Sequence, residues 1–152
     1  EDNRVRTTLA KQLALYVVLY SPLQMAADLI ENYDNHPAFQ FILDVPVDWE
    51  ETLVLNGEIG EYITIARKDR ESADWYIGSI TDEKGRVFEI DLAFLDEDKK
   101  YTAEIYADGP GADWESNPQS YEIRHVNVDR KSTIKIELAP GGGQAIRIRP
   151  LD

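Results

Sequence analysis

The side chains in this sequence best suited to chemistry are carboxylates, which gather in three short runs at Glu50–Glu51, Asp82–Glu83 and Asp96–Asp98. Acid–base catalysis by a carboxylate pair requires two groups held across a cleft with separated pKa values. Neighbours in sequence on turns do not provide that geometry. We therefore interpret the three runs as solvated surface.

A second group of candidates lies in the segment Asp108–Glu115, which combines carboxylates with Trp114 in a long loop. Its oxygen atoms could suit calcium, and its indole ring could stack on a sugar. The loop lacks the glutamate-terminated spacing of a helix–loop–helix calcium site. We expect a structural loop with Trp114 packed over a sheet edge, and we keep Trp114 and Tyr106 as candidate sugar contacts.

The remaining motifs favour structural roles. Gly141–Gly143 lacks the spacing of a phosphate-binding loop and predicts a turn. His125 lies within a strand pattern and is expected to be hydrogen-bonded in a sheet, whereas His36, before Pro37, is expected to be a cap or surface residue. The sequence has two histidines and no cysteine. It therefore offers few ligands for a zinc enzyme, no cysteine nucleophile and little material for a histidine relay. The sequence predicts no catalytic, cofactor-binding or metal-binding residue.

Composition excludes further classes. The 152 residues carry a net charge of -13, which repels phosphate backbones and anionic lipids, so we expect neither nucleic-acid nor membrane partners. The longest apolar run, Leu13–Tyr20, is far shorter than the roughly 20 residues needed to span a bilayer. The opening Glu1–Asn3, without methionine or targeting peptide, indicates an excised piece, and the other end is expected to be a natural C-terminus.

The first third of the chain predicts helices. Residues 7–20 form one helix with Thr7 or Thr8 as N-cap, and it is apolar on nearly every side, so we expect it to be covered on several sides. Ser21–Gln24 resembles a capping box that starts a second helix carrying Leu23–Leu29. Pro37 is expected to start a short helical turn over residues 38–43, and the helical segment ends at residue 47.

From residue 48 the apolar period changes from 3.6 to 2, with turn signals about every eight to twelve residues. This pattern predicts an antiparallel β-sandwich of about eight strands, so the fold class is α+β and mainly β. Asp82–Gly85 is expected to be a hairpin turn that joins the third strand to the fourth. The predicted strands cover residues 52–56, 62–67, 75–80, 86–92, 101–106, 121–128, 133–138 and 144–149.

Four stretches resemble the C-terminal end of glycoside hydrolase family 97 enzymes: Thr7–Leu29, Phe39–Trp49, Gly60–Arg67 and Leu138–Gly143. The resemblance implies α-glucosidases and α-galactosidases with an N-terminal β-supersandwich, a catalytic (β/α)8 barrel and a C-terminal β-sandwich. Residues 1–47 would be a remnant of the last barrel helices, and residues 48–152 would be the C-terminal sandwich. The catalytic acid, the base or nucleophile and the calcium-binding glutamates of that family match no residue here.

The resemblance therefore implies that this chain is non-catalytic and stabilises the barrel of a parent enzyme that hydrolyses α-glucosides or α-galactosides with calcium. The expected partners are that barrel and, for the parent, an oligosaccharide substrate, and the implied location is periplasmic or otherwise extracytoplasmic. Two alternatives are a carbohydrate-binding sandwich and a protein-interaction module. Without the barrel, we expect the apolar helix to fold back onto the sandwich. We also expect the chain to retain weak self-association through the apolar surface that stays exposed.

Overall fold

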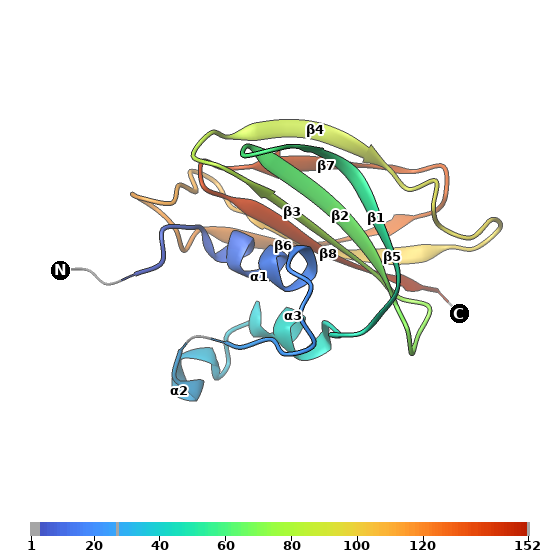
Figure 1. The fold of residues 1–152 in the computed structure, drawn as a ribbon, viewed down its shortest axis with the longest axis horizontal. Coiled ribbons are helices and arrows are strands. Elements are labelled where there is room, and N and C mark those ends of the chain that lie inside the picture. The colour runs from blue at the N-terminus through green and yellow to red at the C-terminus, as the bar shows by residue number, and fades with distance from the viewer. Residues whose placement is uncertain (1–3, 27, 152) are drawn as a thin grey trace.

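The computed structural model describes residues 4–26 and 28–151 (Figure 1). In chain order these residues form three helices followed by eight strands. The elements are α1 (Leu9–Val18), α2 (Ile30–Tyr33), α3 (Phe39–Asp44), β1 (Trp49–Glu58), β2 (Tyr62–Asp69), β3 (Trp75–Thr81), β4 (Arg86–Asp91), β5 (Tyr101–Asp108), β6 (Tyr121–Val128), β7 (Thr133–Leu138) and β8 (Gly143–Pro150).

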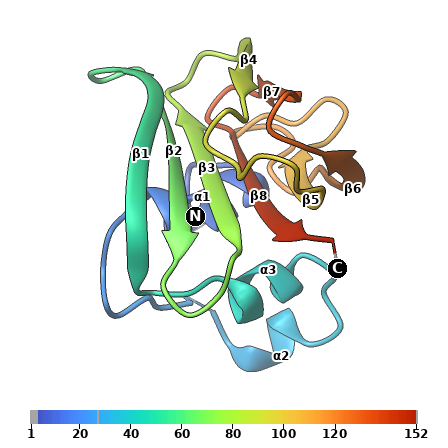
Figure 2. The same cartoon turned by 90° about the vertical axis from the view of Figure 1, so that its right-hand side faces the viewer.

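The strands form two antiparallel sheets, which confirms the predicted fold class. Six strands pair in the order β1-β2-β3-β8-β5-β6, and the remaining two form the ribbon β4-β7. Figures 1 and 2 show the ribbon over one face of the large sheet and the three helices over the other. The described helices are all too short and too polar to cross a membrane.

The main core lies between the large sheet and the ribbon. Because side chains alternate along a strand, every second residue of the central strands enters this layer. Large aliphatic side chains from both sheets meet here with almost no exposed surface. They include Ile77, Ile146, Ile148, Ile105, Ile134, Ile136, Leu92 and Leu95.

The predicted hairpin at Asp82–Gly85 is wrong. Strand β4 pairs with β7 and not with β3, so this turn carries the chain from one sheet to the other. Both edges of β3 are already occupied, by β2 and by β8. The turn is held by side chains, because the Asp82 carboxylate accepts a hydrogen bond from the backbone N–H of Lys84 at 2.9 Å.

The helical segment also differs from its prediction. Thr8 is the N-cap of α1, accepting from the N–H of Lys11 at 3.2 Å, but α1 ends at Val18. No helix forms over the described residues 21–29. Ser21 bonds to Leu23 rather than to a capping-box partner, with its hydroxyl donating to the Leu23 carbonyl at 2.6 Å. Ala27, part of that predicted helix, lies outside the described residues.

Helix α1 packs closely against β3 and β8, and glycine makes the approach possible. A Cβ atom on Gly78 would lie 2.6 Å from the Ala14 carbonyl oxygen, and one on Gly143 would lie 2.5 Å from the Cα of Lys11. Leu13, Ala14 and Val17 are consequently buried. The helix folds back as expected, and every residue of α1 is buried or partly buried, whereas Leu19 and Tyr20, beyond its end, are exposed.

Two arginines of the large sheet, the buried Arg67 and the partly buried Arg147, hold the helices in place. Arg67 donates from Nε to the Val17 carbonyl at 2.6 Å and from Nη1 to the Thr52 hydroxyl at 2.7 Å, so it satisfies the free end of α1. Burial lowers the pKa of Arg67.

Arg147 anchors the end of α3. Its guanidinium lies 2.7 Å from the Asp44 carboxylate and 2.8 Å from the Asp74 carboxylate. The Tyr76 hydroxyl donates to the Asp44 carbonyl at 2.9 Å. These bonds fix the point at which the helical segment enters β1.

We expect Val17→Glu to lower the free energy of unfolding by about 3 kcal/mol or more, because it places an unpaired carboxylate between α1 and the sheet. Leu13→Glu should act in the same way. The matched control is Leu23→Glu, at an exposed position, which should change the free energy of unfolding by less than about 0.5 kcal/mol. Urea unfolding followed by circular dichroism measures both. Equal effects of Val17→Glu and Leu23→Glu would contradict the packing of α1.

We expect Arg147→Met to lower the free energy of unfolding by about 2 to 3 kcal/mol, because it leaves the carboxylates of Asp44 and Asp74 without their shared cation in a partly buried place. Arg149→Met is the control, since Arg149 lies exposed on the same strand. It should change stability by less than about 0.5 kcal/mol. Urea unfolding followed by circular dichroism measures the stability of both variants. Indistinguishable urea midpoints for Arg147→Met and Arg149→Met would rule out the anchoring role of Arg147.

Candidate functional site

Trp114, one of the two candidate sugar contacts, packs against the glycine turn that precedes β8. Its backbone N–H donates to the Pro140 carbonyl at 3.1 Å. A Cβ atom on Gly141 would lie 2.5 Å from the Cβ of Trp114, so the indole covers that turn closely. Trp114 is half-buried, and the position agrees with the expected structural loop packed over a sheet edge.

Tyr106, the other candidate, is in the core. Its side chain is 1% exposed, its ring meets Phe41 edge to face at 5.2 Å, and its hydroxyl donates to Glu104 at 2.6 Å. No face of the ring is open to a ligand. Tyr106 and Trp114 therefore do not form the exposed coplanar platform that stacking on a sugar needs.

The acidic runs are held in ion pairs with neighbouring cations. Glu50 lies 2.7 Å from Lys68, and Asp96 lies 2.7 Å from Lys99, whose hydrogen bond lowers the pKa of Asp96. Hydrogen bonding to Arg86 lowers the pKa of Asp82 to about 2. Among residues 4–26 and 28–151 there is no cluster of acids and histidines that could hold a metal ion.

Asp108 has a structural role at the glycine turn. Its Oδ2 atom accepts from the backbone N–H groups of Ala139 at 2.9 Å and Gly143 at 3.0 Å. A Cβ atom on Gly142 would collide with the same oxygen. Burial raises the pKa of Asp108, while the two backbone hydrogen bonds act in the opposite direction. This carboxylate closes a turn, and Gly141–Gly143 is the turn that the sequence predicts.

The two histidines occupy peripheral positions. His36 accepts at Nδ1 from the N–H of Ala38 at 3.3 Å, but Ala38 is itself the N-cap of α3 and that helix has no side-chain cap, so His36 is a partly buried residue of the preceding turn. His125 is exposed, and its Nε2 lies 3.6 Å from Glu104. That distance exceeds a hydrogen bond, so the predicted hydrogen bond of His125 is not formed.

The most unusual surface belongs to residues 19–43. Several large apolar side chains here are more than half exposed, far beyond what scattered surface hydrophobes require. Ile30 and Leu43 also line one open hollow of about 710 Å³. We call this set the helical apolar surface, and it consists of Leu19, Tyr20, Leu23, Met25, Leu29, Ile30 and Leu43.

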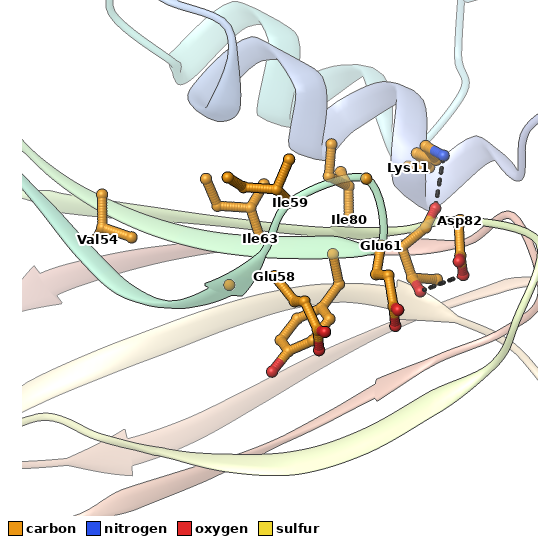
Figure 3. A pocket seen from close by; sticks show the side chains of 12 residues that line it. Lys11, Val54, Glu58, Ile59, Glu61, Ile63, Ile80 and Asp82 are labelled. Carbon is orange, nitrogen blue, oxygen red and sulfur yellow. Dashed lines mark hydrogen bonds between the residues drawn. The ribbon is translucent and has the colours of Figure 1, made fainter.

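A second apolar surface lies at the tip of the β1–β2 hairpin. Val54, Ile63 and Ile80 line a groove of about 560 Å³, with Ile59 at its rim. In Figure 3 the isoleucines lie on the side of the hairpin that faces α1, while Glu58 and Glu61 point to the opposite side. We call this surface the hairpin groove.

Lys11 closes one end of the hairpin groove. Its Nζ donates to the Thr81 carbonyl at 2.7 Å, as Figure 3 shows. Burial lowers the pKa of Lys11, and the nearby carboxylates of Asp82 and Asp108 oppose that shift. Sequence reasoning missed the groove, although one signal was present: Ile59 precedes Gly60 at a turn, where polar residues are usual.

Comparison with known proteins identifies the relatives of this arrangement. A retaining alpha-galactosidase of Bacteroides thetaiotaomicron is 41% identical over 143 residues, which are 93% of this chain and 21% of that protein. A glycoside hydrolase family 97 enzyme from Pseudoalteromonas sp. strain K8, solved with panose and with acarbose, is 51% identical with a TM-score of 0.95. The match covers 99% of this chain and 24% of that enzyme.

A crystal structure of a beta-arabinopyranosidase is more distant, at 27% identity and a TM-score of 0.74 over 93% of this chain and 21% of that one. The chain thus spans only about a fifth to a quarter of the length of these relatives, as their coverages of 21% and 24% show. The family model described as "Glycosyl-hydrolase 97 C-terminal, oligomerisation" matches residues 48–149. That range is most of the chain and contains all eight strands but for the last residue of β8, and the chain belongs to this C-terminal family of glycoside hydrolase 97.

Proposed function

We propose that this chain is the C-terminal, non-catalytic part of a family 97 α-glycosidase and that it stabilises the catalytic barrel of that enzyme. The observation that carries the proposal is the helical apolar surface. Its side chains are ordered on a folded chain yet left in water, with Leu23 71% and Met25 77% exposed. The solved relative matches the chain over 99% of its length within a polypeptide about four times as long.

The energetic argument is direct. Each large apolar side chain left in water forgoes roughly 1.5 to 3 kcal/mol of burial. Three or four of them therefore forgo about 5 to 10 kcal/mol, which is comparable with the stability of a whole domain. A covering partner is needed, and the preceding part of the same polypeptide is the nearest one. In the chain by itself, the same surface is available for weak self-association.

The parent's chemistry follows from the relatives. Their names include a retaining alpha-galactosidase and an enzyme bound to panose and acarbose, which supports hydrolysis of α-galactosides or α-glucosides, with an oligosaccharide as substrate. Calcium would belong to the barrel of the parent and not to this chain. By family resemblance, the parent would act outside the cytoplasm, in the periplasm or beyond.

The alternative of a carbohydrate-binding sandwich has less support. It would rest on Trp114 alone, because Tyr106 is enclosed by the core. Half of the indole surface is already used against the glycine turn. We therefore keep Trp114 only as a possible peripheral contact of the parent's oligosaccharide.

We expect the purified 152-residue chain to hydrolyse neither aryl α-glucosides nor aryl α-galactosides, with or without calcium, because its carboxylates lie in turns and ion pairs rather than across a cleft. Release of the chromogenic aryl alcohol is the measurement, and the Pseudoalteromonas enzyme with panose is the positive control. Turnover that disappears when one carboxylate of this chain is neutralised, for example in Glu104→Gln, would contradict the proposal.

In the complete polypeptide, we expect the double variant Leu23→Glu/Met25→Glu to lower the midpoint of thermal unfolding by several degrees, because two charges enter the contact with the barrel. The same pair should leave the isolated chain unchanged, since both positions are exposed there. Val87→Glu, an exposed position on β4, is the control in both settings. Scanning calorimetry measures the midpoint of thermal unfolding of each protein. If the double variant leaves the midpoint unchanged in the complete polypeptide as well as in the isolated chain, docking through this surface is refuted.

A further inference from the structure

The side chain of Ile59 has no structural reason to be apolar. It is 104% exposed relative to its reference state and touches none of the core. The turn needs Gly60, whose φ is 84°, and it is closed by the N–H of Glu61 donating to the Glu58 carbonyl at 3.0 Å. Any residue with an ordinary backbone conformation would serve at position 59. An isoleucine there loses burial energy unless something covers it.

The covering surface and the exposed residue lie side by side. The hairpin groove is walled by Val54, Ile63 and Ile80, and it is open to solvent along the face that Ile59 borders. Val54 is itself 65% exposed. A projecting isoleucine and an apolar hollow on one patch are self-complementary, so two copies related by a two-fold axis can each insert Ile59 into the other's groove.

We propose that the hairpin groove is the contact between two copies of this chain. The proposal rests on the family membership that also supports the proposed function. The description of the matching family model includes oligomerisation, and the proposal adds the surface through which two copies meet. The family model covers residues 48–149, which include the hairpin and leave out almost all of the helical segment. Two of the four exposed large apolar side chains recorded within that range, Val54 and Ile59, belong to the hairpin groove.

The other two, Val87 and Val126, lie apart from each other on β4 and β6. Val126 is a single exposed side chain on its strand. Val87 borders a hollow whose lining mixes small and apolar residues with the charged side chains of Arg86, Asp108, Glu122, Arg124 and Glu137. Neither offers an apolar projection beside an apolar hollow.

Charge disfavours another common way for two copies to associate, which is pairing of their β1 edge strands into one continuous sheet. β1 is an edge strand, and it carries Glu50, Glu51 and Glu58 but no cation. Antiparallel pairing of two β1 strands would bring these carboxylates together. The apolar side of the hairpin, which faces α1 and carries no carboxylate of Glu58 or Glu61, avoids that repulsion. Two copies therefore meet through side chains and not by extending the sheet.

The test uses the 152-residue chain carrying Leu23→Glu/Met25→Glu, which removes self-association through the helical apolar surface. Into this background we introduce Ile59→Asp. The matched control is Val87→Asp, which places the same charge at another exposed β-branched residue. Sedimentation equilibrium measures the dimer dissociation constant. We expect Ile59→Asp to raise it at least about tenfold and Val87→Asp to change it by less than about twofold. Because both positions are exposed, circular dichroism should report the same fold for both variants.

A second readout uses the absence of cysteine from the sequence. A single Val54→Cys, exposed on the groove side of the hairpin, should give covalent dimers with a short bis-maleimide, whereas Glu89→Cys, exposed on β4, should not. The proposal is overturned by a background chain that stays monomeric at about 1 mM, by a dimer that Ile59→Asp leaves intact, or by equal cross-linking at both cysteines. None of these results would contradict docking of the chain on the barrel, because that contact is tested separately, in the complete polypeptide, with the substitutions at Leu23 and Met25.

Discussion

The arrangement of this chain depends on the close approach of α1 to β3 and β8. Gly78 and Gly143 bring the helix backbone so near the sheet that even a methyl group at either position would meet helix atoms. Leu13, Ala14 and Val17 then fill the space that a layer of larger side chains would otherwise need. Without this contact the part of the large sheet under α1 would lie open, and only α3, through Phe41 and Asp44, would still pack on that face.

The two faces of the large sheet are consequently held by different forces. The face toward the ribbon β4-β7 is lined by aliphatic side chains together with Trp75 and Tyr101, and it is stabilised mainly by burial of apolar surface. The face toward the helices combines aromatic rings with Arg67 and Arg147, whose guanidinium groups bond to the ends of α1 and α3. A guanidinium fixes direction as well as distance. The helical segment is therefore held in one orientation, with several of its large apolar side chains exposed.

The sequence predicted the strands well because alternation with period 2 has a simple physical origin, namely one buried face per strand. The predictions for residues 121–128 and 133–138 match β6 and β7 in full. Local signals failed where tertiary contacts decide. The turn at Asp82–Gly85 looks like a hairpin, but β2 and β8 already occupy the edges of β3. Tyr106 is aromatic and follows the strand pattern, yet only packing with Phe41 shows that its ring is enclosed.

The failure of the predicted helix over residues 21–29 has a different cause and carries the functional meaning. That segment is rich in apolar residues without a surface of this chain to bury them on, and isolated short helices are marginal in water. Its sequence thus fits a partner that this chain does not contain. At the hairpin groove the relation is reversed, since β1 pairs with β2 along its length despite an irregularity between Val54 and Asn56, and it is the side chain of Ile59 that is left uncovered. Apolar side chains that find no cover within their own chain suit a permanent contact within one longer polypeptide, whereas an apolar projection beside an apolar hollow suits association between separately folded copies.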